Sequence, residues 1–582
     1  MVENFKKILY LLTTNERKRA VLLLILILIM ALIEAIGVVS ILPFMAVLTN
    51  PELIDTNIIL NDMFQFSKKF GVENNKNFLI VLGILVFLTI VISLMFKLIT
   101  TYAQIRFAEM RHYSISKRLV EGYLHQPYSW FLNHHSADLG KTILSEVSQV
   151  IALGLNPLIE LISKSMVAIA LISLLIIVDP KLAIIVGFSL GGAYGLIFYF
   201  IRNYLDRIGK KLLKNNQLRF MTISEAFGAI KLLKLGGFEK TYIKKYSESA
   251  QSYAESMISS QVTSQIPRFI LEAVSFGGVV LIILYLMTQT GSFNNALPII
   301  SLYVFAGYRL MPAMQQIYSA LTQLTFVGPS LENLSNNFKD SKFIYPDINQ
   351  EILSFNKTIT LKNINYRYPN ASRTTLKDIN LNIPAKTKVG IIGTTGSGKT
   401  TTVDIILGLL EAQKGTLEVD GQIITKKNLR VWQRSIGYVP QNIYLTDNSV
   451  AANIAFGLET KDINQTIVEK VSKIANLHEF VMSELPNQYQ TKIGENGIRL
   501  SGGQRQRIGI ARALYHNPKV LILDEASSAL DDLTEKIVMD AINNISKDVT
   551  IIVIAHRLNT LKNCDIIFKF DEGRLINQER IS

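Results

Sequence analysis

The sequence predicts a polytopic α-helical membrane domain with six transmembrane helices, followed by an α/β domain. Three observations support this fold class. The 582 residues are 49% hydrophobic, which is high for a soluble protein of this length. Six long apolar stretches lie before residue 325. Alternating strand and helix patterns with a glycine-rich loop follow.

Each apolar stretch is long enough to cross ~30 Å of hydrocarbon as a helix of ~20 residues. Helices are expected because unpaired backbone groups are costly in lipid. The first stretch is longer than the apolar core of a signal peptide, so we expect it to be retained. We place the spans at about 20–48, 77–104, 154–178, 181–203, 266–288 and 296–321.

Positive charge is concentrated on one side of these spans, within a chain of formal net charge +14. The N-terminal segment carries Lys6, Lys7, Arg17, Lys18 and Arg19, and the two long connections are also basic. Cytoplasmic loops carry such an excess, so this side and both termini are predicted to be cytoplasmic. The charge is not accompanied by a nucleic-acid-binding motif, so we expect no nucleic-acid partner.

The change in composition predicts three segments: a transmembrane domain over 1–325, a linker over 326–350 and an ATP-binding domain over 351–582. In the last segment, short apolar strands are expected at 359–364, 379–383, 389–393, 520–523 and 550–555. Helical patterns between them indicate a mostly parallel sheet with covering helices. The single cysteine, Cys564, excludes a disulfide framework.

The strongest local signal is a glycine-rich run between a predicted strand and a predicted helix, from Gly393 to Thr400. It matches the phosphate-binding loop and predicts that the α/β domain is a cytoplasmic P-loop NTPase domain. Glycines let successive N–H groups surround phosphates, and the helix dipole adds attraction. We expect Lys399 to neutralise the β- and γ-phosphates and the Thr400 hydroxyl to bind Mg²⁺. The predicted ATP-binding run is Gly393, Thr394, Thr395, Gly396, Ser397, Gly398, Lys399, Thr400 and Thr401.

A second signal is the apolar strand that ends in Asp524-Glu525. The carboxyl end of a strand lies at the sheet edge where ligands bind. Asp524 is expected to hold Mg²⁺, directly or through water, and Glu525 to orient or deprotonate the attacking water. Two adjacent acids on a surface turn would mean little by themselves, but here they follow a phosphate-binding loop.

Between these motifs, Leu500-Ser-Gly-Gly-Gln504 resembles the signature sequence of ABC ATPases, about 100 residues after the phosphate loop and about 20 before the acidic pair. In that family the segment opens a helix that faces the γ-phosphate bound by the partner subunit. The resemblance therefore implies a dimer, and complete motifs in one chain favour a homodimer. It assigns contacts with the partner chain's ATP to Leu500, Ser501, Gly502, Gly503 and Gln504.

Further positions match the same family. Tyr368 matches the aromatic residue that stacks on adenine, and Gln441 the glutamine that senses Mg²⁺ and the γ-phosphate. His556 matches the switch histidine at the γ-phosphate. The interface loop is matched by Ser528, Ala529, Leu530 and Asp531. The resemblance covers nearly the whole chain and implies an ATP-hydrolysing transporter with the type I exporter fold, also called type IV.

Charged residues inside the apolar spans are costly and should face a cavity or a partner. The candidates are Glu34, Lys97, Arg268, Glu272 and Arg309. Arg268 and Glu272 are four residues apart on one predicted helix, a spacing that also allows them to pair only with each other. Arg309 has no obvious local acid. An arginine that faces a cavity would suit an anionic phosphate or pyrophosphate head group. We therefore regard Arg268 and Arg309 as candidate substrate contacts.

Three segments narrow the resemblance: Ile266 to Glu272, Tyr308 to Pro312 and Pro440 to Leu445. They are similar to segments of bacterial flippases for lipid-linked oligosaccharides. This implies ATP-driven flipping of a lipid-linked oligosaccharide or polysaccharide precursor across the bacterial inner membrane. Two alternatives remain: a multidrug or lipid exporter of the same architecture, and an ATP-gated channel or regulator. Intact Glu525 and His556 argue against the second, since such a role can dispense with turnover.

Overall fold

The computed structural model describes residues 2–178, 180–290, 293–340, 355–369, 371–494, 497–525, 531–545, 548–555, 561 and 564–580. The chain folds into two compact units. The first comprises residues 1–126 and 134–343, and the second comprises residues 127–133 and 344–582. Predicted site residues Ser528, Ala529, Leu530 and His556 lie outside the described residues.

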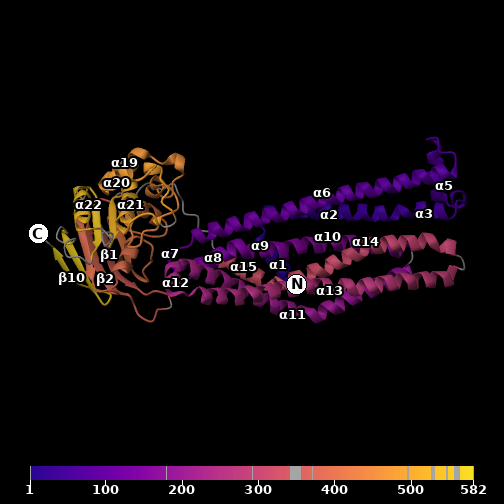
Figure 1. Ribbon diagram of the computed structural model, residues 1–582, viewed down its shortest axis with the longest axis horizontal. Coiled ribbons are helices and arrows are strands. Elements are labelled where there is room, and N and C mark those ends of the chain that lie inside the picture. The colour runs from indigo at the N-terminus through magenta and orange to yellow at the C-terminus, as the bar shows by residue number, and fades with distance from the viewer. Residues whose placement is uncertain are drawn as a thin grey trace. The chain divides into compact units, whose positions relative to one another are not determined.

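The first unit is a bundle of long helices (Figure 1). Its helices are α1 (Val2–Leu11), α2 (Thr14–Val39), α3 (Ile41–Thr49), α4 (Leu53–Thr56), α5 (Ile58–Lys68), α6 (Asn75–Leu124), α8 (Ser136–Lys141), α9 (Val147–Val150), α10 (Asn156–Val178), α11 (Pro180–Gly228), α12 (Ile230–Gly236), α13 (Glu239–Thr290), α14 (Phe293–Phe326) and α15 (Gly328–Asp340). Two π-helical turns, η1 (Thr142–Glu146) and η2 (Ile151–Leu155), flank α9.

Each predicted apolar stretch lies in a helix of this unit. The first is divided at Ser40, between α2 and α3, where the Ser40 hydroxyl donates to the Gly37 carbonyl at 2.8 Å. Helices α6, α11 and α13 are 50, 49 and 52 residues long, so they continue well beyond the apolar stretches. Within the described residues, Thr14–Thr49, Asn75–Leu124 and Ser136–Ile177 are long and apolar enough to cross a membrane.

The outer surface of the spans is apolar, unlike that of a soluble helical bundle. Leu22 is 67% exposed, Phe87 65% and Ile177 81%. Other apolar side chains are buried between the helices, and Ile27, Leu171 and Ala306 are fully buried there. Exposed leucine, isoleucine and phenylalanine on apolar helices are the pattern expected for contact with lipid.

The second unit contains two sheets. The first is antiparallel, with strand order β2-β1-β4-β5. The second has the order β10-β9-β3-β8-β7-β6, in which only β10 runs antiparallel to its neighbour. The strands are β1 (Thr358–Tyr366), β2 (Leu376–Pro384), β3 (Lys388–Gly393), β4 (Lys414–Val419), β5 (Gln422–Ile423), β6 (Ile436–Val439), β7 (Val520–Asp524), β8 (Thr550–Ile554), β9 (Ile566–Asp571) and β10 (Arg574–Arg580).

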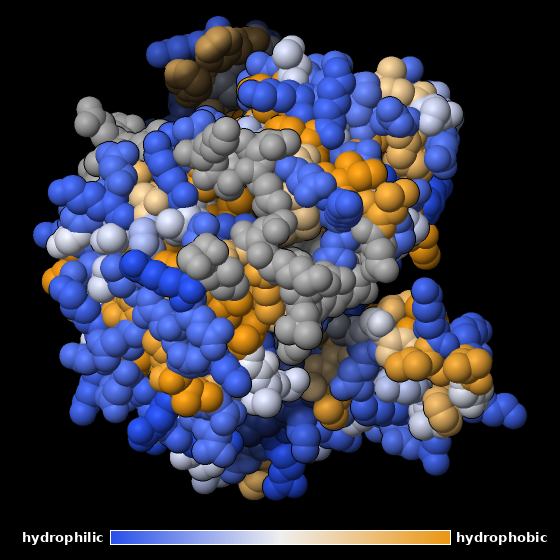
Figure 2. Space-filling model, turned by 90° about the vertical axis from the view of Figure 1, so that its left-hand side faces the viewer, coloured by the Kyte–Doolittle hydropathy of each residue, from blue (hydrophilic) through white to orange (hydrophobic). Residues whose placement is uncertain are grey.

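Strands β7 and β8 are buried along their whole length, as expected for central parallel strands covered on both faces. The helical elements of this unit are α7 (Tyr128–Phe131), α16 (Lys399–Ile406), α17 (Leu429–Arg434), α18 (Val450–Ile454), α19 (Gln465–Ile474), α20 (His478–Glu484), α21 (Gly502–Tyr515) and α22 (Asp532–Ile545), with the 3₁₀ turns η3 (Thr460–Asp462) and η4 (Gln488–Gln490). The face of this unit seen in Figure 2 is largely hydrophilic, with hydrophobic side chains in small separate groups.

Candidate active site

The phosphate-binding loop connects β3 to α16, as the sequence predicts. Gly393, Gly396 and Gly398 have φ values of +152°, +80° and +101°, which residues with a side chain rarely adopt. A Cβ atom at Gly393 would also overlap the carbonyl oxygen of Phe570. Glycine is therefore required here for both conformation and space, and the loop can bring its N–H groups close to an anion.

Two side chains of this loop are arranged for a ligand. The Lys399 Nζ donates to the carbonyl oxygens of Gly393 and Thr394, at 2.7 and 3.0 Å. Burial lowers the pKa of Lys399, whereas Glu525 and Asp524 act in the opposite direction. Within the described part of the chain, the buried hydroxyl of Ser397 has no hydrogen-bond partner. A buried polar atom without a partner is costly, and a bound phosphate oxygen would provide one.

The acidic pair lies at the carboxyl end of β7. Because β3, β8, β7 and β6 are parallel, their carboxyl ends lie at one edge of the sheet. Asp524 is buried, and Glu525 has a φ of +50°, in the left-handed region. Such backbone strain is concentrated at functional sites. The Gln441 Nε2 donates to Glu525 Oε2 at 2.8 Å, so the structure brings together two residues separated by 84 positions.

The predicted Mg²⁺ ligands provide the chemistry that this ion needs. The Thr400 hydroxyl, the Gln441 amide and the Asp524 carboxylate offer oxygen donors, which Mg²⁺ prefers. Thr400 and Gln441 are exposed, so solvent can reach them. The residues present therefore fit the ion.

Tyr368 is half-buried, and its hydroxyl lies 3.1 Å from the Thr401 hydroxyl. This bond connects the predicted adenine-stacking residue to the first turn of α16. The ring of Tyr366 packs edge-on against Tyr368, with 5.1 Å between centroids. Burial raises the pKa of the Tyr368 hydroxyl, so this hydroxyl is neutral at physiological pH.

The signature segment caps the N-terminus of helix α21 with its own side chains. The Ser501 hydroxyl accepts from the Gln504 N–H at 3.2 Å, and the Gln504 side chain accepts from the Ser501 N–H at 2.8 Å. This reciprocal capping box fixes the first turn of α21. Ser501 is exposed, whereas Leu500 is buried and anchors the segment. An exposed helix N-terminus that carries a hydroxyl is suited to an anion.

Of the predicted interface loop, the structure describes Asp531, which is exposed. Its carboxylate accepts from the Thr534 N–H at 3.0 Å, at the start of α22. Hydrogen bonding with Thr534 lowers the pKa of Asp531, and the charge of Arg507 lowers it further.

Sequence reasoning missed two residues beside Asp524. The Tyr438 hydroxyl donates to Asp524 Oδ2 at 3.5 Å. Burial, followed by the charge of Asp524, raises the pKa of Asp404 to about 6. The spacing offers a signal for Asp404, because it lies one helical turn after Thr400 and therefore on the same face of α16. Tyr438 lies on the neighbouring strand β6, paired in register with Ile522 of β7.

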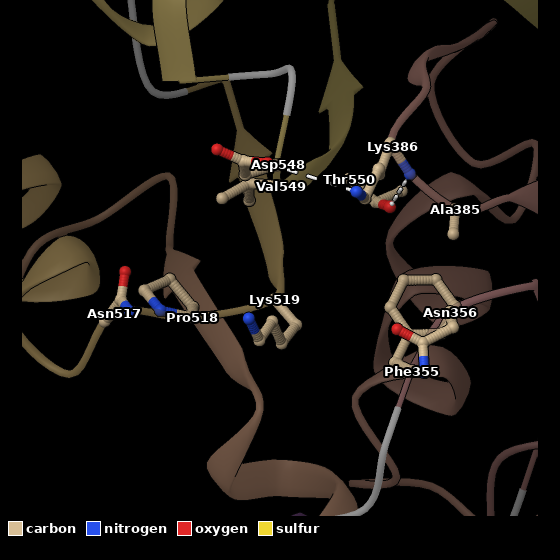
Figure 3. Close-up of a pocket in the computed structure, with 10 residues that line it drawn as sticks. All are labelled: Phe355, Asn356, Ala385, Lys386, Asn517, Pro518, Lys519, Asp548, Val549 and Thr550. Carbon is tan, nitrogen blue, oxygen red and sulfur yellow. Dashed lines mark hydrogen bonds and ion pairs between the residues drawn. The ribbon is translucent and has the colours of Figure 1, made fainter.

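A pocket of ≈310 Å³ lies at the opposite edge of the same sheet (Figure 3). Lys386, Lys519 and Thr550 stand at or before the amino ends of β3, β7 and β8. The Lys386 N–H donates to the Thr550 hydroxyl at 2.7 Å. Ligands of such sheets bind at the carboxyl ends of the strands, so this pocket is distinct from the candidate active site.

The membrane unit contains a second group of charged side chains. Arg309 of α14 donates to Glu34 Oε1 of α2 at 2.8 Å, and Lys97 of α6 donates to the same oxygen at 3.4 Å. Arg309 therefore does have an acidic partner, which comes from a distant part of the chain. Arg268 pairs with Glu272 on its own helix at 2.9 Å, as the spacing indicates.

Comparisons with known proteins agree with this architecture. A family model described as ABC transporter matches residues 376–528, and one described as ABC transporter transmembrane region matches residues 56–312. An ATP-dependent lipid A-core flippase of Cupriavidus metallidurans is 30% identical over 474 residues, which cover 79% of this chain and 77% of the relative. One of Albidiferax ferrireducens is 31% identical over 461 residues, with 77% of each chain covered.

A solved bacterial Atm1-family ABC exporter with ATP bound has a TM-score of 0.78 and 20% sequence identity. The match covers 97% of this chain and 96% of that one, and it supports the type IV exporter fold. The chain therefore belongs to the ABC transporter family, as an exporter-type membrane protein in which a transmembrane region is fused to an ATPase domain whose ATP hydrolysis is coupled to transport.

Proposed function

We propose that this transporter flips an amphipathic lipid with an anionic head group across the bacterial inner membrane. The cargo that fits best is a lipid-linked oligosaccharide or polysaccharide precursor. The observation that carries the proposal is the meeting of Arg309 and Lys97 at Glu34, within otherwise apolar helices. Ionisable groups inside spans are costly and usually serve substrates or ions. The names of the two flippase relatives, which specify lipid A-core, support a lipid cargo.

Arg268 and Arg309 are the proposed substrate contacts. A guanidinium offers several donors in one plane and binds phosphate oxygens in pairs. Arg268 is 51% exposed, so its present pairing with Glu272 leaves it accessible. Arg309 is 20% exposed and lies on α14 beside the buried residues Ala306 and Leu310. Both arginines lie on helices of the membrane unit, and Arg268 is the more exposed of the two.

At the ATPase domain we propose a homodimer with two composite sites. Each site would combine the phosphate loop of one chain with Leu500, Ser501, Gly502, Gly503 and Gln504 of the other. The exposed, capped start of α21 supports this arrangement, because its N–H groups can receive an anion from outside the chain. Ser528, Ala529, Leu530 and Asp531 would form the neighbouring interface loop.

Within each site, Tyr368 would stack on adenine, and residues 393–401 would surround the phosphates. Thr400, Gln441 and Asp524 would hold Mg²⁺, which when bound neutralises charge on the phosphate oxygens. Glu525 would take a proton from the attacking water, and its hydrogen bond with Gln441 holds the carboxylate in place. His556 would contact the γ-phosphate.

ATP would then drive movement through differential binding. ATP favours the state in which two chains close around it, and hydrolysis removes that preference. The basic N-terminal segment and basic helical extensions support an orientation with both termini in the cytoplasm, where ATP is available.

The test is ATP-dependent flipping of a fluorescent polyprenyl-pyrophosphate oligosaccharide in proteoliposomes, with Glu525→Gln as the control. Flipping by the wild type that is lost in Glu525→Gln supports the proposal. Absence of flipping, with ATP hydrolysis intact and stimulated by unrelated apolar drugs, would replace the lipid-linked cargo with a multidrug role.

A further inference from the structure

Glu34 is bound by its two cationic partners at a single carboxylate oxygen. Arg309 donates to Oε1 at 2.8 Å and Lys97 donates to the same atom at 3.4 Å. The three residues come from three helices, α2, α6 and α14. Lys97 follows Glu34 by 63 positions in the chain, and Arg309 follows it by 275. Glu34 is 5% exposed, compared with 20% for Arg309 and 37% for Lys97. The acid is therefore enclosed, and its cations reach toward it from more open positions.

The surroundings make this charge group unusual. Met30, Ala31 and Val38 on α2 are buried against α10 and α14, so Glu34 lies in an apolar core. Lys164 of α10 interacts electrostatically with Glu34, Lys97 and Arg309, and also with Glu160. At Glu34 itself, two cations thus meet one carboxylate among the described residues, which leaves a formal surplus of one positive charge. Excess charge in an apolar setting favours the binding of an anion.

We propose that Glu34 is an internal counter-ion that occupies Arg309 until the anionic head group of the substrate displaces it. The proposal rests on the proposed function, because the displacing group is the pyrophosphate of a lipid. A phosphate group has more oxygens and more charge than one carboxylate, so it competes well for a guanidinium. Exchange keeps Arg309 paired at every stage, which avoids the cost of a buried unpaired cation. The nearby Lys97 gives the displaced Glu34 a partner of its own.

Glu34 would therefore set how readily the substrate binds. Such a residue is a positioning residue, because it acts through Arg309 and does not touch the cargo. The Arg268–Glu272 pair differs, since it is an ordinary pair four residues apart on one helix, with 51% and 36% exposure. Its geometry does not enclose the acid.

The test measures ATP hydrolysis by the full-length chain in phosphatidylcholine vesicles as a short-chain polyprenyl pyrophosphate is added. In Glu34→Gln the competing charge is removed, while the side chain keeps its size. The half-maximal stimulating concentration is expected to fall about fivefold, the order expected when a charged hydrogen-bond competitor becomes neutral. The corresponding polyprenol, which lacks phosphate, is expected to show no difference between the two proteins.

The matched control is Glu16→Gln, which neutralises another buried glutamate of α2. Glu16 pairs with Arg111 at 3.2 Å and is also largely buried. This variant is expected to lower thermal stability without lowering the half-maximal concentration. If Glu34→Gln does not fold, Glu34→Asp, with a shorter carboxylate, is expected to shift the concentration in the same direction by a smaller factor.

The outcomes separate this proposal from the proposed function. Stimulation of the wild type with an unchanged or higher half-maximal concentration in folded Glu34→Gln would overturn the counter-ion role and leave the cargo in place. An equal shift with polyprenol would also overturn it. A wild type that polyprenyl pyrophosphate does not stimulate at all would overturn the proposed cargo, and the counter-ion role with it.

Discussion

The two units place their charged groups in different ways. In the ATPase domain, short loops at one edge of a parallel sheet carry Lys399, Gln441 and Glu525. In the membrane unit, Glu34, Lys97 and Arg309 come from three separate helices, α2, α6 and α14. Each residue of the first group lies in its own short sequence motif, although the motifs are far apart in the chain. The second depends on helix packing and leaves only isolated charges. Sequence motifs therefore identify ATP hydrolysis as the energy source. The cargo, in contrast, has to be inferred from contacts between side chains in the folded membrane unit.

The largest effect is expected at Glu525. Glu525→Gln removes the proposed base while keeping its shape and its neighbour Gln441, so ATP hydrolysis should fall by about 10²–10³-fold. Binding of a fluorescent ATP analogue should be retained. Phosphate release and nucleotide binding measured on the same protein check this. The exposed residue Glu459 pairs with Lys461, and Glu459→Gln is the matched control that should retain full activity. Retained hydrolysis in Glu525→Gln would remove Glu525 from the chemistry.

In the membrane unit, a large effect on folding stability is expected at a buried ion pair. Lys141 and Glu146 form a buried ion pair at 2.9 Å, with 5% and 0% exposure, and Glu146 also accepts from Asn333 at 2.7 Å. Glu146→Gln removes the nearer counter-charge of the buried Lys141 and leaves only Asp138, at 3.7 Å, so stability should fall by about 2–3 kcal/mol. Calorimetric unfolding in detergent measures the change. The exposed Asp206–Lys210 pair is the control, and Asp206→Asn should cause no measurable shift. Equal shifts in both variants would contradict the role of burial.

Two variants of Ser501 separate its role as a helix cap from its proposed role as a contact to ATP. Ser501→Ala should reduce ATP hydrolysis by about tenfold, the cost of a lost hydrogen bond to a charged group. It should also weaken α21 by about 1 kcal/mol. Ser501→Asp keeps a capping oxygen but places negative charge at the proposed γ-phosphate contact. It should therefore unfold like the wild type and hydrolyse poorly. Wild-type hydrolysis in Ser501→Asp would show that Ser501 only caps the helix.

The smallest effect concerns Asp404, whose pKa is raised to about 6 by burial and by Asp524. The folded state favours its protonated form, so stability falls as pH rises from near 4 through 6 and stays lower above. Asp404→Asn should therefore stabilise the Mg²⁺-free protein by about 1–2 kcal/mol at pH 8. The gain should shrink through pH 6 and vanish near pH 4. Unfolding curves at several pH values test this, and a gain independent of pH would rule out ionisation as its cause.

The same difference between the two units decides which features could be predicted from the sequence. The phosphate loop and Ser501–Gln504 are contiguous runs whose conformation depends on nearby glycines and caps, so their positions on loops and helix starts were predictable. The pairing of Gln441 with Glu525 follows from adjacent parallel strands. The Glu34 contacts were not predictable, because helix rotation and packing decide which side chains meet across 275 positions. The two π-helical turns that flank α9 were not predicted either, because no recognisable sequence pattern marks them.

We propose that ATP hydrolysis in one unit moves an anionic lipid head group past Arg309 in the other. The most direct measurement follows flipping of a labelled polyprenyl-pyrophosphate oligosaccharide and basal ATP hydrolysis in the same proteoliposomes, for the wild type and Arg309→Gln. We predict that Arg309→Gln keeps basal hydrolysis and loses flipping and lipid-stimulated hydrolysis. Flipping at the wild-type rate by Arg309→Gln would show that Arg309 does not contact the cargo.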